Sequence, residues 1–268
     1  MARLGILFLI LMWSALPILL VVLSSFKNPA TIFETPPRLI FKPIIRNYIT
    51  LAREWPEFFT SLVNSFIITV GSASLVAAVS LITGYTYSRY RKKLLTLSAF
   101  FILAIRMLPP IIISISLFPV AHALDIDDTH FLMIILYSAF FVSLGSWIMK
   151  SFIDQIPREL DESATLDGAS TFQIIRMIIL PLGVHGIIAV FIFVAIFAWK
   201  EYLLASIFTA FTARTAPIVT SQMLSSVTGT QWGPLMAAAV IQLLPILVFV
   251  LVTQKFLVKT FTIGAVKG

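Results

Sequence analysis

Residues 4–26 read LGILFLILMWSALPILLVVLSSF and contain no charged side chain. A helix needs about 20 consecutive apolar residues to cross the hydrocarbon core of a bilayer, so this run is long enough to span one. Five further stretches of the 268-residue chain have the same character. The sequence therefore predicts an all-α, multi-pass membrane protein, a single transmembrane domain over residues 1–268. Its six predicted crossings are residues 4–26, 58–87, 95–121, 131–149, 184–208 and 235–256.

The composition excludes a water-soluble globule. Hydrophobic residues make up 59% of the chain and charged residues only 12%, whereas a soluble domain carries about half apolar and about a quarter charged residues. Lipid is expected to cover most of the surface. The first apolar run is too long for a signal-peptide core and lacks a small-x-small cleavage site, so we expect it to be a retained anchor. With no cysteine, the chain has no disulfide framework and no thiolate metal site.

The distribution of Lys and Arg predicts the orientation in the membrane. The N-terminus, residues 88–94, residues 150–181 and the C-terminal tail together carry 11 of these residues, and the opposite side carries 6. Because positively charged loops resist translocation, both termini are predicted to be cytoplasmic. The net charge of +7 then reports topology, and no nucleic-acid partner is expected.

Residues 151–181 form the most informative loop, since they hold five of the twelve acidic residues. Pro157 suits the first turn of a helix, and acidic residues just after it suit the positive end of a helix dipole. Gly168 predicts the end of that helix. Ser170 and Gln173 then have the spacing of a capping box that opens a second helix, expected to run up to Pro181. The sequence predicts a helix–turn–helix elbow.

The physics of this elbow leaves two interpretations open. Two short amphipathic helices at an angle could form a rigid knob that docks into another protein. Equally, such helices are common as connectors that lie on the bilayer surface.

A family resemblance favours the docking knob. The run Glu162 to Ala169 (ESATLDGA), followed by Leu180-Pro181, resembles the cytoplasmic EAA loop of permease subunits of bacterial ABC importers. Further matches narrow the resemblance to the carbohydrate importers, the maltose-type permeases. They are Ser25-Phe26-Lys27, Pro36-Pro37, Asn47-Tyr48, Asn64-Ser65, Arg106-Met107-Leu108-Pro109-Pro110, Trp199-Lys200-Glu201-Tyr202 and the ending Gly264-Ala265-Val266-Lys267-Gly268.

The resemblance implies a type I ABC importer permease fold in the bacterial cytoplasmic (inner) membrane. It implies four partners besides lipid: a second homologous permease, a dimer of ATPase subunits, an extracytoplasmic sugar-binding protein and a carbohydrate substrate. No catalytic residue, cofactor or metal is expected in this chain, which lacks a Gly-x4-Gly-Lys-Ser/Thr loop; ATP and Mg would bind the ATPase. The residues implied to couple the two subunits are Glu162, Ser163, Ala164, Asp167, Gly168 and Ala169.

Charged residues inside apolar runs are candidates for the substrate pathway, because each costs roughly 2.5–3.5 kcal/mol at a helix centre. Arg106 could line the pathway, form a structural ion pair or stretch toward the lipid headgroups. Glu201, with Trp199 and Tyr202 beside it, offers the acceptors and flat apolar faces that sugars bind; the alternative is interfacial anchoring with a Lys200–Glu201 pair.

Other polar clusters have simpler interpretations. The run from Arg89 to Lys93 is expected to hold topology, with contact to anionic lipid as a second role. Asp125, Asp127 and Asp128 are expected to form a solvated acidic loop, and the three histidines are too scattered for a metal site. The small-residue stretch 71–78 predicts close helix packing.

A stand-alone secondary transporter remains the alternative function. Such a carrier would need ion-coupling carboxylates within its crossings and usually an internal repeat. The sequence shows neither feature.

Overall fold

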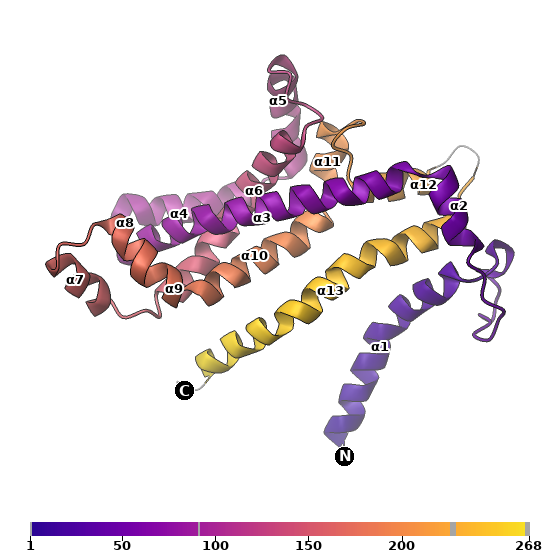
Figure 1. Cartoon of the computed structure of the whole chain (residues 1–268), viewed down its shortest axis with the longest axis horizontal. Helices are drawn as coiled ribbons and strands as arrows, with labels where there is room; N and C mark the ends of the chain where they lie inside the picture. The colour runs from indigo at the N-terminus through magenta and orange to yellow at the C-terminus, as the bar shows by residue number, and fades with distance from the viewer. Residues whose placement is uncertain (1, 91, 226–228, 266–268) are drawn as a thin grey trace. The chain divides into compact units, whose positions relative to one another are not determined.

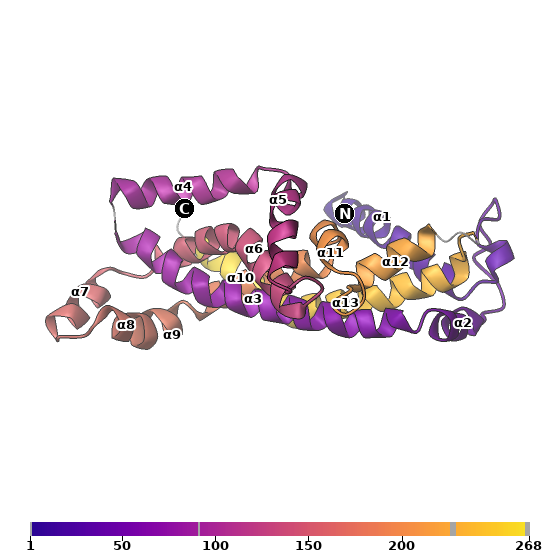
Figure 2. The same cartoon turned by 90° about the horizontal axis from the view of Figure 1, so that it is seen from above.

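The computed structural model describes residues 2–90, 92–225 and 229–265, and every regular element within these ranges is helical (Figures 1 and 2). The predicted all-α class is confirmed. The longer helices are α1 (Ala2–Ser25), α3 (Glu57–Arg89), α4 (Lys93–Arg106), α5 (Pro110–Ala123), α6 (His130–Ile153), α10 (Val184–Trp199) and α13 (Trp232–Ala265). The shorter elements are η1 (Pro29–Thr31), α2 (Arg46–Glu54), α7 (Glu159–Leu166), α8 (Thr171–Ile174), η2 (Ile175–Ile179), α9 (Leu180–Leu182), α11 (Leu203–Phe208) and α12 (Ala216–Leu224).

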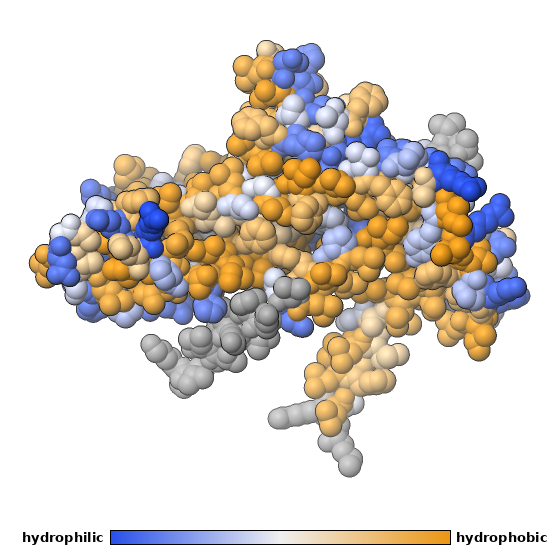
Figure 3. All heavy atoms as spheres, in the orientation of Figure 1, coloured by the Kyte–Doolittle hydropathy of each residue, from blue (hydrophilic) through white to orange (hydrophobic). Residues whose placement is uncertain are grey.

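Four of the described helices, α1, α3, α6 and α13, are individually long and apolar enough to cross a membrane, and two bent pairs raise the possible number to six. Their side chains remain largely uncovered: the membrane-length window of α1 has no buried residue. Apolar residues dominate the visible face of the molecule, as lipid coverage requires (Figure 3).

The predicted third crossing is a bent pair instead of one continuous helix. Helices α4 and α5 meet at 92° across the break at residues 107–109. Pro110 begins α5, and Pro109 before it is held in extended conformation at φ −58° and ψ 128°. A proline disfavours helical geometry in the residue that precedes it. The two prolines therefore end α4.

The predicted fifth crossing is also interrupted. Helix α10 ends at Trp199, and α11 resumes at Leu203. At its other end, Gly183 separates Val184–Trp199 from the preceding helical segment Thr171–Leu182, and the two segments meet at 77°. The expected span of 184–208 is thus α10 plus a short capped helix.

The chain falls into two compact units. The first comprises Met1–Val63 and Thr215–Leu247. Its core is formed by Leu51, Phe58, Ala216, Val219, Met223, Leu235, Ala237 and Ala238. The Asn47 side-chain amide, only 2% exposed, donates to the carbonyls of Ser25 (2.7 Å) and Lys27 (2.8 Å). One buried amide thereby fixes the end of α1 against the start of α2.

The second unit comprises Asn64–Arg214 and Val248–Gly268, and small residues bring its helices into close contact. Ser138 of α6 donates to the carbonyl of Ser72 in α3 at 3.4 Å, which confirms close packing at the predicted small-residue stretch. A Cβ placed on Gly145 would lie 2.8 Å from Val76 Cγ1 of α3 and 3.1 Å from Val190 Cγ1 of α10. Helices α3, α6 and α10 therefore meet at Gly145, since no side chain fits there.

We predict that Gly145→Leu destabilises the second unit. The added side chain would push apart three helices, at a cost of about 1–3 kcal/mol for overpacking. The measurement is the thermal unfolding midpoint of the detergent-purified protein, which should fall by several degrees. The matched control is Gly5→Leu, because nothing lies within 4 Å of a Cβ on Gly5. Equal midpoints for the two variants would contradict the packing described.

Candidate functional site

The elbow has the predicted helix–turn–helix form. Helix α7 is followed by a turn in which Gly168 has a φ of +84°, a conformation that favours glycine. Ser170 then caps α8: its hydroxyl accepts from the Gln173 amide at 3.4 Å, and its own amide donates to Gln173 Oε1 at 2.8 Å. The glycine turn and the capping box are both confirmed.

The limits of the two helices differ from the prediction. Pro157 lies two residues before α7 begins at Glu159, with Arg158 as the N-cap residue, so it is outside the first turn. The second helix passes through Pro181 to Leu182 by way of the π-helical segment η2. It can do so because the wider π turn accommodates a proline that lacks an amide donor.

The implied coupling residues lie on the accessible side of the elbow. Glu162, Ser163, Asp167 and Gly168 are exposed, and Ala164 and Ala169 are half-buried. Large apolar side chains beside them are also uncovered: Leu166 is 89% exposed and Phe172 is 70% exposed. The elbow thus presents both carboxylates and large apolar side chains at its accessible surface.

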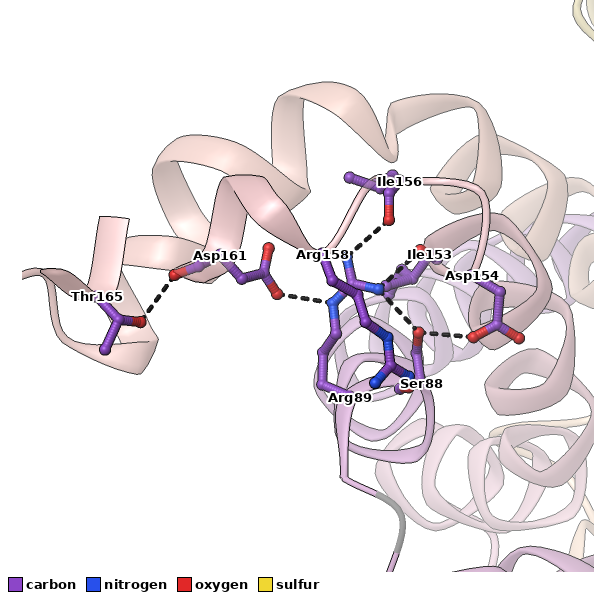
Figure 4. Close-up of polar contacts among 8 residues, drawn as sticks. All are labelled: Ser88, Arg89, Ile153, Asp154, Ile156, Arg158, Asp161 and Thr165. Carbon is purple, nitrogen blue, oxygen red and sulfur yellow. Dashed lines mark hydrogen bonds and ion pairs between the residues drawn. The ribbon is translucent and has the colours of Figure 1, made fainter. Parts of the chain in front are cut away.

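A buried ion pair attaches α7 to the helix bundle (Figure 4). Arg89 Nε, in the last turn of α3, lies 2.6 Å from Asp161 Oδ2, and the two side chains are 8% and 11% exposed. The same guanidinium donates to the carbonyls of Ile153 (3.3 Å) and Ile156 (3.1 Å). Asp161 is the one buried residue of α7.

Further polar contacts reinforce this attachment (Figure 4). Arg158 Nη2 donates to the carbonyl of Ser88 at 2.6 Å, and Ser88 Oγ donates to Asp154 Oδ1 at 2.7 Å. Lys150 Nζ contacts the other oxygen of Asp154 at 2.6 Å. We call Ser88, Arg89, Asp154, Arg158 and Asp161 together the elbow clamp.

Sequence reasoning missed the elbow clamp. It placed Arg89 in a surface cluster that holds topology, and it placed Asp161 in the first turn of α7 for its effect on the helix dipole. The usable signal was the acidic excess of residues 151–181 opposite a basic helix end, but charge alone does not identify which residues pair.

Arg106 lies at the bend between α4 and α5. Its guanidinium carbon is 5.4 Å from the ring centre of Phe140 and 5.6 Å from that of Phe141. It borders a hollow of about 200 Å³ whose other lining residues include Pro110 and Ser114. Among the described residues no carboxylate lies within ion-pair distance of Arg106. Aromatic faces, and not the ion pair considered above, accommodate this charge.

Glu201 occupies the break between α10 and α11. Its carboxylate accepts from the Tyr137 hydroxyl at 2.7 Å and from the amides of Leu204 (2.9 Å) and Ala205 (3.3 Å). It thus caps α11. The alternative Lys200–Glu201 pair is absent from the described part of the chain: Lys200 Nζ lies 4.5 Å from the ring centre of Phe197 instead.

The two aromatic candidates beside Glu201 have different environments. Trp199 is buried at 6% exposure, and Tyr202 is 46% exposed. Of these two residues, Tyr202 is the one whose ring is accessible to a ligand in this conformation.

The acidic loop between α5 and α6 is organised rather than merely solvated, which corrects the expectation for Asp128. Its carboxylate accepts four backbone amides, those of Ala210 (2.9 Å), Phe211 (2.9 Å), Thr212 (2.8 Å) and Ala213 (3.0 Å). Burial by itself would raise the pKa of Asp128, but the four amides outweigh it and lower that pKa to about 2. The carboxylate is charged at neutral pH and holds the 210–213 turn.

Asn64 secures the other side of the same turn. Its amide donates to the carbonyls of Thr212 (2.8 Å) and Arg214 (3.0 Å), and its oxygen lies 2.8 Å from His130 Nε2. Helices α3 and α6 are thus both connected to this turn.

The fold and the elbow define a multi-pass, all-helical membrane protein with an accessible helix–turn–helix segment. The chain belongs to the family described as "binding-protein-dependent transport system inner membrane component", whose match covers residues 76–262. This family membership confirms the resemblance to ABC importer permeases. The matched range includes the whole elbow.

Individual relatives extend the similarity to almost the full chain. The probable ABC transporter permease protein y4oR of Sinorhizobium fredii is 34% identical, with 92% of this chain and 88% of that protein covered. The trehalose/maltose transport system permease protein MalG of Thermococcus litoralis is 30% identical over 94% of this chain and 91% of that protein.

A crystal structure gives the same fold. It is that of a bacterial ABC transporter involved in the import of the acidic polysaccharide alginate, with a TM-score of 0.76 and coverage of 95% of this chain and 94% of that one. At 18% sequence identity, this similarity concerns the fold alone.

We predict that Asp128→Asn loosens the 210–213 turn. An Asn side chain directs an NH₂ group at amides that need an acceptor, so unsatisfied donors remain. Hydrogen exchange at the amides of residues 210–213 should accelerate by at least about tenfold at pH 7. The control is Asp125→Asn, because Asp125 also has a φ of 54° but is exposed.

The pH dependence of this effect follows from the low pKa. A carboxyl group whose pKa is depressed when folded stabilises the protein above its ordinary value, and the stabilisation is lost as pH falls through the depressed value. For Asp128 this range runs from about 3.8 to about 2. The stability difference between the wild type and Asp128→Asn should narrow in that range. A constant difference down to pH 2 would contradict the assignment.

Proposed function

We propose that this protein is the permease subunit of an ATP-driven importer that moves a carbohydrate, from monosaccharide to oligosaccharide, across the cytoplasmic membrane. The observation that carries the proposal is near full-length similarity to permeases named for sugars. The relatives include the trehalose permease SugB of Mycobacterium tuberculosis, 33% identical, and the probable starch degradation products permease AmyC of Thermoanaerobacterium thermosulfurigenes, 32% identical.

The proposal assigns the elbow to the docking of a separate ATPase subunit, which would bind ATP and Mg. Glu162 is exposed and could pair with a basic residue of that subunit. Ala164 is small and half-buried, so α7 can lie close to a groove. Closure of an ATPase dimer would then move two elbows together and change which side of the bundle is open.

The remaining assignments follow from the importer proposal. A second homologous permease completes the pathway, and an extracytoplasmic binding protein delivers the sugar. Both termini and the elbow are cytoplasmic. In the substrate pathway we place Arg106 and Tyr202 as direct contacts with the sugar. Trp199 and Glu201 are placed as residues that shape the break between α10 and α11.

Reconstitution tests this function. The permease, its partner permease and the ATPase subunits would be placed in proteoliposomes with the binding protein, and uptake of labelled maltose and trehalose would be followed. Uptake should require hydrolysable ATP and the ATPase. Uptake by this chain without an ATPase would favour the stand-alone secondary transporter instead.

We predict that Gly168→Val uncouples transport. A β-branched residue at a φ of +84° is strained by about 1–2 kcal/mol even in open space, so the turn would change its shape. Sugar uptake should fall while the amount of protein in the membrane stays the same. Uptake and membrane abundance are measured together.

Gly168→Asn separates backbone shape from side-chain size. Asn tolerates the left-handed region and, like Val, adds a side chain at this position. Uptake should therefore decrease in the order Gly, Asn, Val. Wild-type uptake by the Val variant would exclude a coupling role for this turn.

A further inference from the structure

Helix α7, the exposed half of the elbow, has little apolar contact with the helices that it would have to move. Asp161 is the one buried residue of α7, while Leu160 is 41% exposed. On the side of Leu160 lies a hollow of about 340 Å³ that is also lined by Ile156, Leu182 and His185. No apolar side chain of α7 is therefore buried against the helix bundle.

The side chain of the bundle that pairs with the buried carboxylate of α7 is that of Arg89. It joins three elements at once: its own helix α3, the α6 end through the carbonyls of Ile153 and Ile156, and α7 through Asp161 (Figure 4). A guanidinium group suits this position because its donors lie in a rigid plane and can serve several acceptors in fixed directions.

The electrostatics of the helix ends support the same arrangement. Arg89 lies near the C-terminal carbonyls of α6, where a positive charge is favoured, and Asp161 lies in the first turn of α7, where a negative charge is favoured. Low exposure of both side chains limits screening by solvent and salt. The pair is thus a fixed connection and not a mobile surface contact.

We propose that Arg89 and Asp161 are the positioning pair that transmits movement of the elbow to α3 and α6. The remaining members of the elbow clamp hold the segments on either side of this pair. Arg158 donates to the carbonyl of Ser88, and the Ser88 hydroxyl donates to Asp154. The inference rests on the proposed function, because it assumes that a partner pushes on α7.

The first test uses Asp161→Asn, which removes the charge and keeps the shape. In the reconstituted importer, sugar transported per ATP hydrolysed should fall by at least about tenfold, because a buried ion pair that loses one charge leaves the other uncompensated. Assembly of the complex is measured by copurification, and rates are normalised to it. Glu159→Gln is the control, since it removes a carboxylate from the same helix at an exposed position.

A second test restores the connection by chemistry. The chain has no cysteine, so Arg89→Cys with Asp161→Cys can be joined by a short bifunctional thiol reagent. The unjoined double variant should hydrolyse ATP with little transport, and joining should raise transport per ATP towards the wild-type ratio. A pair with a merely structural role would not respond in this way.

Two results would overturn the proposal: a wild-type transport ratio in Asp161→Asn, or no recovery after efficient joining of the two cysteines. Both are read against a wild-type importer that shows ATP-dependent uptake. Failure of the wild type itself would instead reject the proposed function. The two failures are therefore distinguishable.

Discussion

The structure depends on one constraint: inside hydrocarbon, every backbone N–H and C=O group must find a partner within the protein. Helical hydrogen bonds satisfy it along most of α1, α3, α6 and α13, although Pro17 in α1 and Pro245 in α13 each remove one donor. An interruption exposes groups that a helix would have paired, and the chain supplies a specific solution at three of the helix starts. Pro110 begins α5 without an amide to satisfy, Glu201 accepts two amides at the start of α11, and the Thr129 hydroxyl accepts an amide at the start of α6.

The need to pair exposed backbone groups and buried charges also explains where three of the acidic residues lie. A chain with so little charge uses its carboxylates as backbone acceptors and as ion-pair partners. Asp128 holds four amides of one turn, Glu201 caps a helix and Asp161 meets Arg89. Each of these carboxylates fixes a segment that the apolar packing leaves undetermined. Charged side chains thus fix the segments between the long helices, and the lengths of the apolar runs set the long helices themselves.

The sequence was sufficient for the features that repeat over many residues or follow from local chemistry. Apolar length predicted the long helices, and the residues Gly168, Ser170 and Gln173 predicted the elbow turn. What it could not supply were contacts between segments far apart in the chain. Arg89 and Asp161 are 72 positions apart, and composition alone assigned Arg89 to topology. Asp128 and its turn are likewise more than 80 positions apart, so the acidic loop was interpreted as solvated.

A polar joint beneath the elbow has a physical advantage over an apolar one. The hydrophobic effect is itself non-directional, and α7 buries no apolar side chain that could interlock with the bundle. Charge-assisted hydrogen bonds to a planar guanidinium fix direction as well as distance. An exposed helix that must carry a displacement to a bundle therefore needs few contacts, provided that these are directional and shielded from water. Arg89, with Asp161 on one side and two main-chain carbonyls on the other, meets both conditions.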